Sequence, residues 1–193
     1  MNYNPDSKCT AFAGTKKIAS GTMIDVALKI KDHLAKDAKA SILVFDDRTS
    51  QQVELDLRGT KDAVVKRLEA LRSPDAEAEI EKKTGPGRPK LGVVAKEVTL
   101  LPDHWDWLSR QPGGASVTLR RLVDAAKKKN AAKDELRQAQ DAAYKFMTVM
   151  GGDLPNYEEA LRALYANDAK KFGKLLQDWP KDIREHASKL AQL

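Results

Sequence analysis

A short peptide in the middle of the chain, GPGRPK at residues 85–90, rules out regular secondary structure through that point. Each of its two prolines lacks a backbone donor and forces the preceding residue toward an extended conformation, so no helix passes through it. Acidic and then basic residues precede it, which predicts a charged linker at 73–91. A chain of 193 residues with 41% hydrophobic content then buries its core in two or three small units.

Residues 1–72 have the pattern of a small α+β domain. Two short strands are predicted about the turn Gly14-Thr15, and Thr22 is placed to cap a helix that ends near Leu34. The runs 41–45 and 53–57 flank a polar turn and predict a hairpin. Thr60 then caps another helix, so the predicted order is ββαββα.

Residues 92–130 predict a strand followed by two helices. The run 93–101 is rich in β-branched residues and is bounded by Gly92 and Pro102. No neighbouring run offers a hairpin turn, so the expected partner is the same strand of a second chain. Pro102 opens a short helix, a Pro-Gly-Gly turn ends it, and Ser116 is expected to cap the next one.

Residues 131–193 predict a bundle of three or four helices. The first continues straight on from Val123 or restarts after a break near Asn130, and Gly151-Gly152 ends it. Trp179 and Phe172 fall on apolar stripes, so we interpret them as core residues.

The tripeptide Gly87-Arg88-Pro89 resembles the centre of an AT-hook, although Pro86 stands where that family has an arginine. The resemblance implies that Arg88 enters an A·T-rich minor groove, with Lys90 or Lys83 supplying the second cation. The alternative is a Pro/Gly linker that happens to carry cations.

The order of strand, short helix, glycine turn and basic helix in 92–130 resembles the ribbon-helix-helix family of DNA-binding dimers. The resemblance implies that two chains pair their strands in the major groove and that the second helix holds a phosphate at its start. One register turns Lys96, Val98 and Leu100 toward DNA, and a shift by one residue turns Glu97, Thr99 and Leu101 there instead. With the AT-hook-like pair, the expected DNA-contacting residues are Arg88, Lys90, Lys96, Thr99, Ser116, Thr118, Arg120, Arg121, Lys127 and Lys128.

The chain as a whole resembles a family of uncharacterised bacterial proteins. The shared segments are GRPKLG, EVTLLP, HWDWL, PGGASVTLRRLV and AAYKFM. This resemblance implies no activity.

Charge and cysteine content narrow the class of protein. A net charge of +6 favours an anionic partner. Cys9 is the single cysteine, which excludes an internal disulfide and suits a reducing compartment. The sequence has neither a membrane-length apolar run nor the layout of a signal peptide, so we expect a cytoplasmic protein, which DNA binding would place at the nucleoid.

The sequence offers no catalytic constellation. His33, His104 and His186 lie far apart, and each is interpreted as a residue on a helix surface. The acidic residues around the 46–56 hairpin are ordinary turn and solvent-face residues. We therefore predict no enzyme, no cofactor and no metal.

Two functions remain. The first is a homodimeric DNA-binding protein, either a transcriptional regulator or a nucleoid-associated protein, that binds double-stranded DNA mainly through phosphates with an A·T preference. The alternative is an antitoxin-like adaptor that dimerises through the central strand and receives a protein partner without binding DNA.

Overall fold

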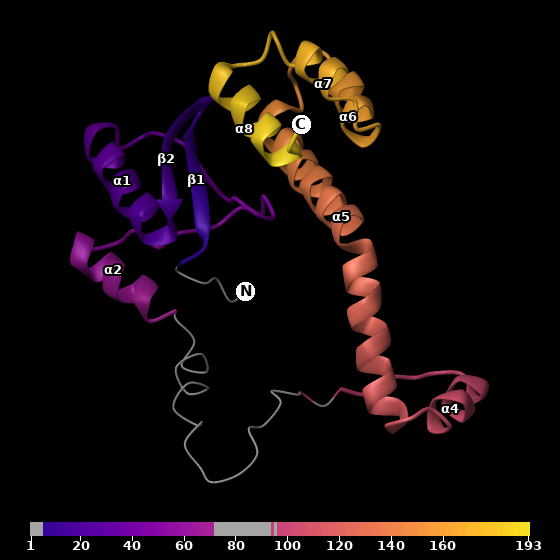
Figure 1. Ribbon diagram of the computed structural model, residues 1–193. Coiled ribbons are helices and arrows are strands. Elements are labelled where there is room, and N and C mark those ends of the chain that lie inside the picture. The colour runs from indigo at the N-terminus through magenta and orange to yellow at the C-terminus, as the bar shows by residue number, and fades with distance from the viewer. Residues whose placement is uncertain (1–5, 72–93, 95) are drawn as a thin grey trace. The chain divides into compact units, whose positions relative to one another are not determined.

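The computed structural model describes residues 6–71, 94 and 96–193, which belong to two compact units (Figure 1). The first unit comprises Met1–Glu77 together with Leu136–Leu193, and the second comprises Ala78–Glu135. The protein is mixed α+β, as predicted, with one small sheet and a majority of helix. No helix in the described ranges is both long enough and apolar enough to cross a membrane.

A three-stranded antiparallel sheet lies at the centre of the first unit. Its strands are β1 (Lys8–Ala13), β2 (Lys16–Thr22) and β3 (Ile42–Asp46), in the order β2-β1-β3. Gly14 in the first turn has φ 55°, a left-handed conformation that glycine adopts without steric cost. The predicted pair of strands about Gly14 is therefore confirmed.

Two capped helices cover one face of this sheet. Thr22 and Asp25 form a capping box at the start of α1 (Met23–Lys36), and Thr60 caps α2 (Lys61–Glu69), so both predicted helix starts are confirmed. The caps satisfy backbone donors that the first helical turn leaves unbonded. The core on this face contains Cys9, Ala11, Met23, Val26, Ile30, Val44, Val64 and Leu68.

The second arm of the predicted hairpin, residues 53–57, is not a strand. After β3 the sheet pattern ends with an isolated bridge between Phe45 and Gln52 and a hydrogen bond of 2.8 Å from Val53 N to Val44 O. The predicted order ββαββα is wrong at this point, and the described order is ββαβα.

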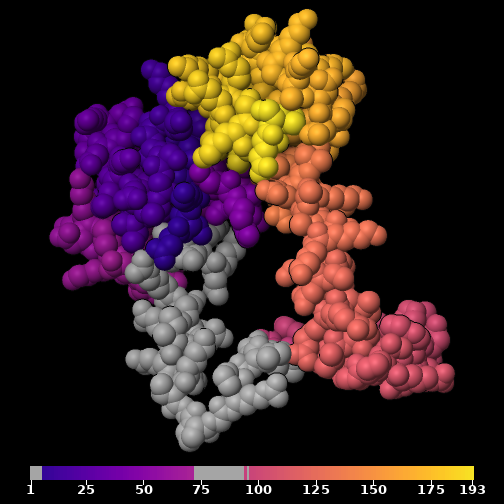
Figure 2. Space-filling model, viewed as in Figure 1, coloured from indigo at the N-terminus to yellow at the C-terminus, as the bar shows by residue number. Residues whose placement is uncertain are grey.

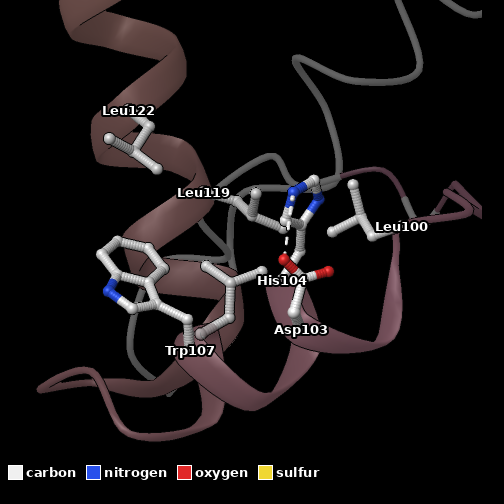
Figure 3. A pocket seen from close by; sticks show the side chains of 7 residues that line it. Leu100, Asp103, His104, Trp107, Leu119 and Leu122 are labelled. Carbon is white, nitrogen blue, oxygen red and sulfur yellow. Dashed lines mark ion pairs between the residues drawn. The ribbon is translucent and has the colours of Figure 1, made fainter.

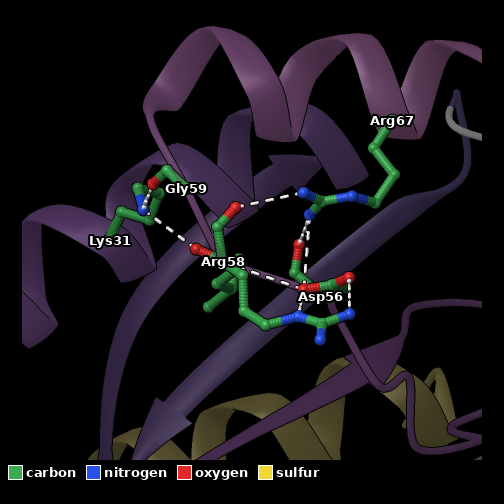
Figure 4. A network of polar contacts seen from close by, with 6 residues as sticks. Lys31, Asp56, Arg58, Gly59 and Arg67 are labelled. Atoms are coloured by element: carbon green, nitrogen blue, oxygen red, sulfur yellow. Dashed lines mark hydrogen bonds and ion pairs between the residues drawn. The ribbon is translucent and has the colours of Figure 1, made fainter.

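Side chains from α1 and α2 donate hydrogen bonds to the backbone at the end of this segment (Figure 4). Lys31 Nζ donates to the carbonyl oxygens of Leu57 at 2.9 Å and Gly59 at 2.6 Å. The Arg67 guanidinium donates to the carbonyl oxygen of Asp56 at 2.6 Å. These cationic donors satisfy backbone acceptors that a neighbouring strand would otherwise bond.

Helices from the end of the chain cover the other face of the sheet. The contacts to this face come from the second half of α5 (Gly114–Gly151) and from α8 (Lys181–Ala191), and α6 (Tyr157–Tyr165) and α7 (Ala169–Leu175) belong to the same core. The core here joins strand residues to helix residues, and its large members are Phe12, Phe45, Phe146, Met147, Leu164, Phe172, Leu176, Trp179 and Ile183. Figure 2 shows the N-terminal and C-terminal segments of this unit in direct contact.

This shared core differs from the predicted domains, which separated 1–72 from 131–193. Phe12 and Phe45 make edge-to-face contacts with each other and ring contacts with Phe146 of α5, at centroid distances of 5.2–6.2 Å. Asp182 of α8 accepts a hydrogen bond of 2.8 Å from the backbone of Lys17 in β2. The sheet is therefore enclosed on both faces.

Candidate nucleic-acid interface

The second unit contains a helical hairpin made of α4 (Pro102–Ser109) and the first half of α5. Pro102 occupies the first turn of α4, where its missing N–H costs no hydrogen bond. Gly113 and Gly114 have φ 84° and 73°, and these left-handed values let the chain reverse between the helices. The predicted helix, glycine turn and helix are confirmed, and α5 continues straight through Asn130 without a break.

Of the strand predicted at 93–101, the described part forms no strand in the single chain. Its described residues, 94 and 96–101, are neither strand nor helix. Lys96 and Thr99 are exposed there. Pairing of this segment between two chains stays a prediction.

An open pocket of about 530 Å³ lies between α4 and α5 (Figure 3). We call it the hairpin pocket. Its wall is apolar and consists of Leu100, Trp107, Leu108, Leu119 and Leu122. Two polar lining residues, Asp103 and His104, lie together on α4 with 4.0 Å between the carboxylate and Nε2.

Four of the predicted phosphate contacts are exposed on α5. Arg120 and Lys127 lie two helical turns apart, as do Arg121 and Lys128, so each pair shares one side of the helix. Both sides differ from the side on which Leu119 and Leu122 line the hairpin pocket. None of the four cations forms an ion pair with any residue in the described part of the chain.

Two predicted contacts are placed differently from expectation. Ser116 is not the N-cap, because Gly114 starts the helix one half-turn earlier and Ser116 lies inside the first turn, where its carbonyl accepts from Arg120 Nε at 3.1 Å. Thr118 is only 1% exposed, and its hydroxyl finds no hydrogen-bond partner among the described residues. A side chain so buried does not reach DNA from this conformation.

The remaining predicted contacts, Arg88 and Lys90, lie outside the described residues, as does the AT-hook-like peptide. The hairpin pocket was missed at the sequence level. Its signature was the helical spacing of its lining: Leu119 and Leu122 are three residues apart on one helix, and on the other Trp107 and Leu108 follow His104 by three and four residues.

The titratable groups with large shifts lie in the first unit, away from these cations in sequence. Burial raises the pKa of the Cys9 thiol to about 12, with Asp46 and Asp47 adding to the effect. His186, interpreted from sequence as a surface residue, is buried at 4% exposure. Across the described ranges, no three or more His, Cys, Asp or Glu side chains are grouped to hold a metal ion.

One comparison with known proteins gives a match. The family model described as "Uncharacterized protein conserved in bacteria (DUF2239)" matches residues 8–191. No curated protein and no solved structure matches the chain. Because the matched range includes the sheet, the helical hairpin and the C-terminal helices, the chain belongs to the DUF2239 family of bacterial proteins.

Proposed function

We propose that this protein binds double-stranded DNA as a homodimer, with most of the affinity coming from contacts between α5 and phosphates. The observation that carries the proposal is the set of exposed cations on α5, Arg120, Arg121, Lys127 and Lys128, without a counter-ion in the described part of the chain. Residues 114–133 contain one acidic residue, Asp124, against six basic ones. An unneutralised basic helix attracts a polyanion and releases its condensed counterions.

In this proposal the phosphate contacts fix the position of the protein but read no sequence. Arg88 and Lys90 add a preference for A·T-rich minor grooves, because such grooves are narrow and strongly negative. Weak base readout suits a nucleoid-associated protein or a regulator with a short recognition site.

The test is DNA binding measured against salt concentration. We expect a steep negative slope of log affinity on log salt. Arg120→Ala with Arg121→Ala removes four cations from a dimer and flattens the slope by about 3 to 4. Lys170→Ala with Lys174→Ala, which removes the same charge from two exposed positions in α7, is the matched control and leaves the slope unchanged. A flat slope in the parent protein excludes the proposal.

The adaptor is a second candidate, favoured by the apolar wall of the hairpin pocket, which suits a protein partner better than DNA. A dimer that shows no retardation of DNA at physiological salt would support it.

A further inference from the structure

The described part of the second unit buries too few side chains to be stable alone. Among its described residues, 94 and 96–135, only Leu108 and Thr118 are buried. A set of large hydrophobic side chains is exposed instead, which we call the exposed apolar set: Val94, Val98, Leu101, Trp105, Trp107, Val117, Leu122 and Val123. Isolated units with so small a core need oligomerisation or another staple.

The exposed area matches what a protein interface requires. Val117 lies one helical turn from Arg121, on a side of α5 away from the pocket, and is left out of the sum. At roughly 100 Å² for each half-exposed side chain of this size, the other seven offer about 700 Å², close to the roughly 800 Å² that each partner contributes to a standard interface. Exposed patches of several hundred Å² are rare on monomers and mark interaction sites. The two tryptophans, exposed by 43% and 50%, are the residue type that dominates interface energetics.

We propose that a second copy of this chain covers the hairpin pocket, so that the α4–α5 hairpins of two chains form one shared core. The inference rests on the proposed function only in taking the acting species to be a homodimer.

A second copy fits for two reasons. A two-fold contact is self-complementary, and this hairpin offers both parts of one: an open apolar pocket and exposed apolar side chains able to enter it on the partner. The pocket wall is also free of cations, since Arg120, Arg121, Lys127 and Lys128 lie on other sides of α5. Two such faces therefore meet without repulsion between these arginines and lysines, which stay accessible to DNA, and the carboxylate that lines the pocket, Asp103, lies 4.0 Å from His104 Nε2 of its own chain.

The experiment measures the oligomeric state of the full chain by sedimentation at roughly 50 μM. This concentration lies well above the roughly micromolar Kd of the weakest interfaces of standard size. We expect a dimer. Leu122→Asp places a carboxylate in the shared core and gives a monomer. Val149→Asp is the matched control, because Val149 lies on the same helix with similar exposure, 43% against 46%, but in the first unit, and it stays dimeric.

Folding and DNA binding are separated from association in the same experiment. Val123→Asp, at a 54% exposed position, is a second disrupting variant, and far-UV circular dichroism checks that helix content is kept. A monomeric parent, or a Leu122→Asp and Val123→Asp pair that both remain dimeric, overturns the inference. A dimer that fails to bind DNA overturns the proposed function alone, and Arg120→Ala with Arg121→Ala should leave the dimer intact.

Discussion

His186 is held uncharged inside the first unit. Its ring packs edge-on against Phe12 and Phe146, at centroid distances of 5.3 Å and 4.6 Å, and Nε2 is buried without a hydrogen-bond partner in the described part of the chain. This burial lowers the pKa of His186 to about 4, an effect that Asp47 opposes and that Lys189 and Lys17 reinforce. Asp47 itself pairs with Lys189 at 3.0 Å, which limits its influence on the imidazole.

The stability of the protein should therefore fall as the pH drops from about 6.5 to about 4. In this pH window His186 binds a proton in the unfolded chain but not in the folded chain. Protonation therefore stabilises the unfolded state and lowers the free energy of unfolding. At 1.36 kcal/mol per pKa unit the loss is at most about 3 kcal/mol. Urea unfolding across this pH range measures it, and His186→Leu should remove most of the slope.

His33→Leu is the control for that experiment, because His33 lies on α1 with partial solvent access. A parent protein with the same free energy of unfolding at pH 6.5 and pH 4.5 would show that His186 is not buried as described.

At the scale of elements, the end of α5 and the approach to α8 depend on one close contact. A Cβ on Gly151 would lie 2.6 Å from Cη2 and Cζ3 of Trp179. Trp179 cannot easily move away, because it is 3% exposed and its Nε1–H donates to the carbonyl oxygen of Pro155 at 2.7 Å. Glycine here is a packing requirement, in addition to ending a helix.

Gly151→Ala should lower the free energy of unfolding by about 1–3 kcal/mol, the usual cost of overpacking a core. Gly173→Ala is the opposite case: nothing lies within 4 Å of its added Cβ, and it sits in α7. That substitution should stabilise by about 0.5–1 kcal/mol, because alanine is the better helix former. Equal effects of the two substitutions in thermal unfolding would contradict this account of Gly151.

Elements with local determinants could be predicted from the sequence. Thr22 and Thr60 cap their helices through residues three positions away, and Pro102 fixes the start of α4 by its own ring. The segment 53–57 has the alternation of a strand, but Lys31 and Arg67 bond its carbonyls from other elements, and no local pattern contains that information. Ser116 was misplaced because two adjacent glycines let the helix begin before it.

At the scale of the whole molecule, the first unit combines the N-terminal segment of the chain with its C-terminal segment. Phe12 and Phe45 lie on a sheet face whose cover comes from α5 and α8, more than a hundred residues later. Nothing in residues 1–72 indicates that this face is buried by the end of the chain. The sequence therefore predicts the strands and helices of the unit, but does not show that they share a core.

The fragment 1–72 should consequently fail to fold by itself. In the full chain Cys9 is 0% exposed with a pKa raised to about 12, so a thiol reagent at neutral pH should react only on unfolding. In the fragment we expect reaction at the rate of an unfolded thiol, and addition of the fragment 131–193 should slow it. Full protection of Cys9 in 1–72 alone would mean that the α1–α2 side is sufficient for folding.

The middle of α5 has no tertiary contacts to bury it along residues 125–135, where every side chain is exposed. The helix is maintained along these residues by its backbone hydrogen bonds and by the intrinsic helix preference of its many alanines and lysines. No tertiary burial adds cooperativity to this stretch. Its amide hydrogens should hence exchange with deuterium through brief local fraying, at rates independent of how tightly the sheet core is held.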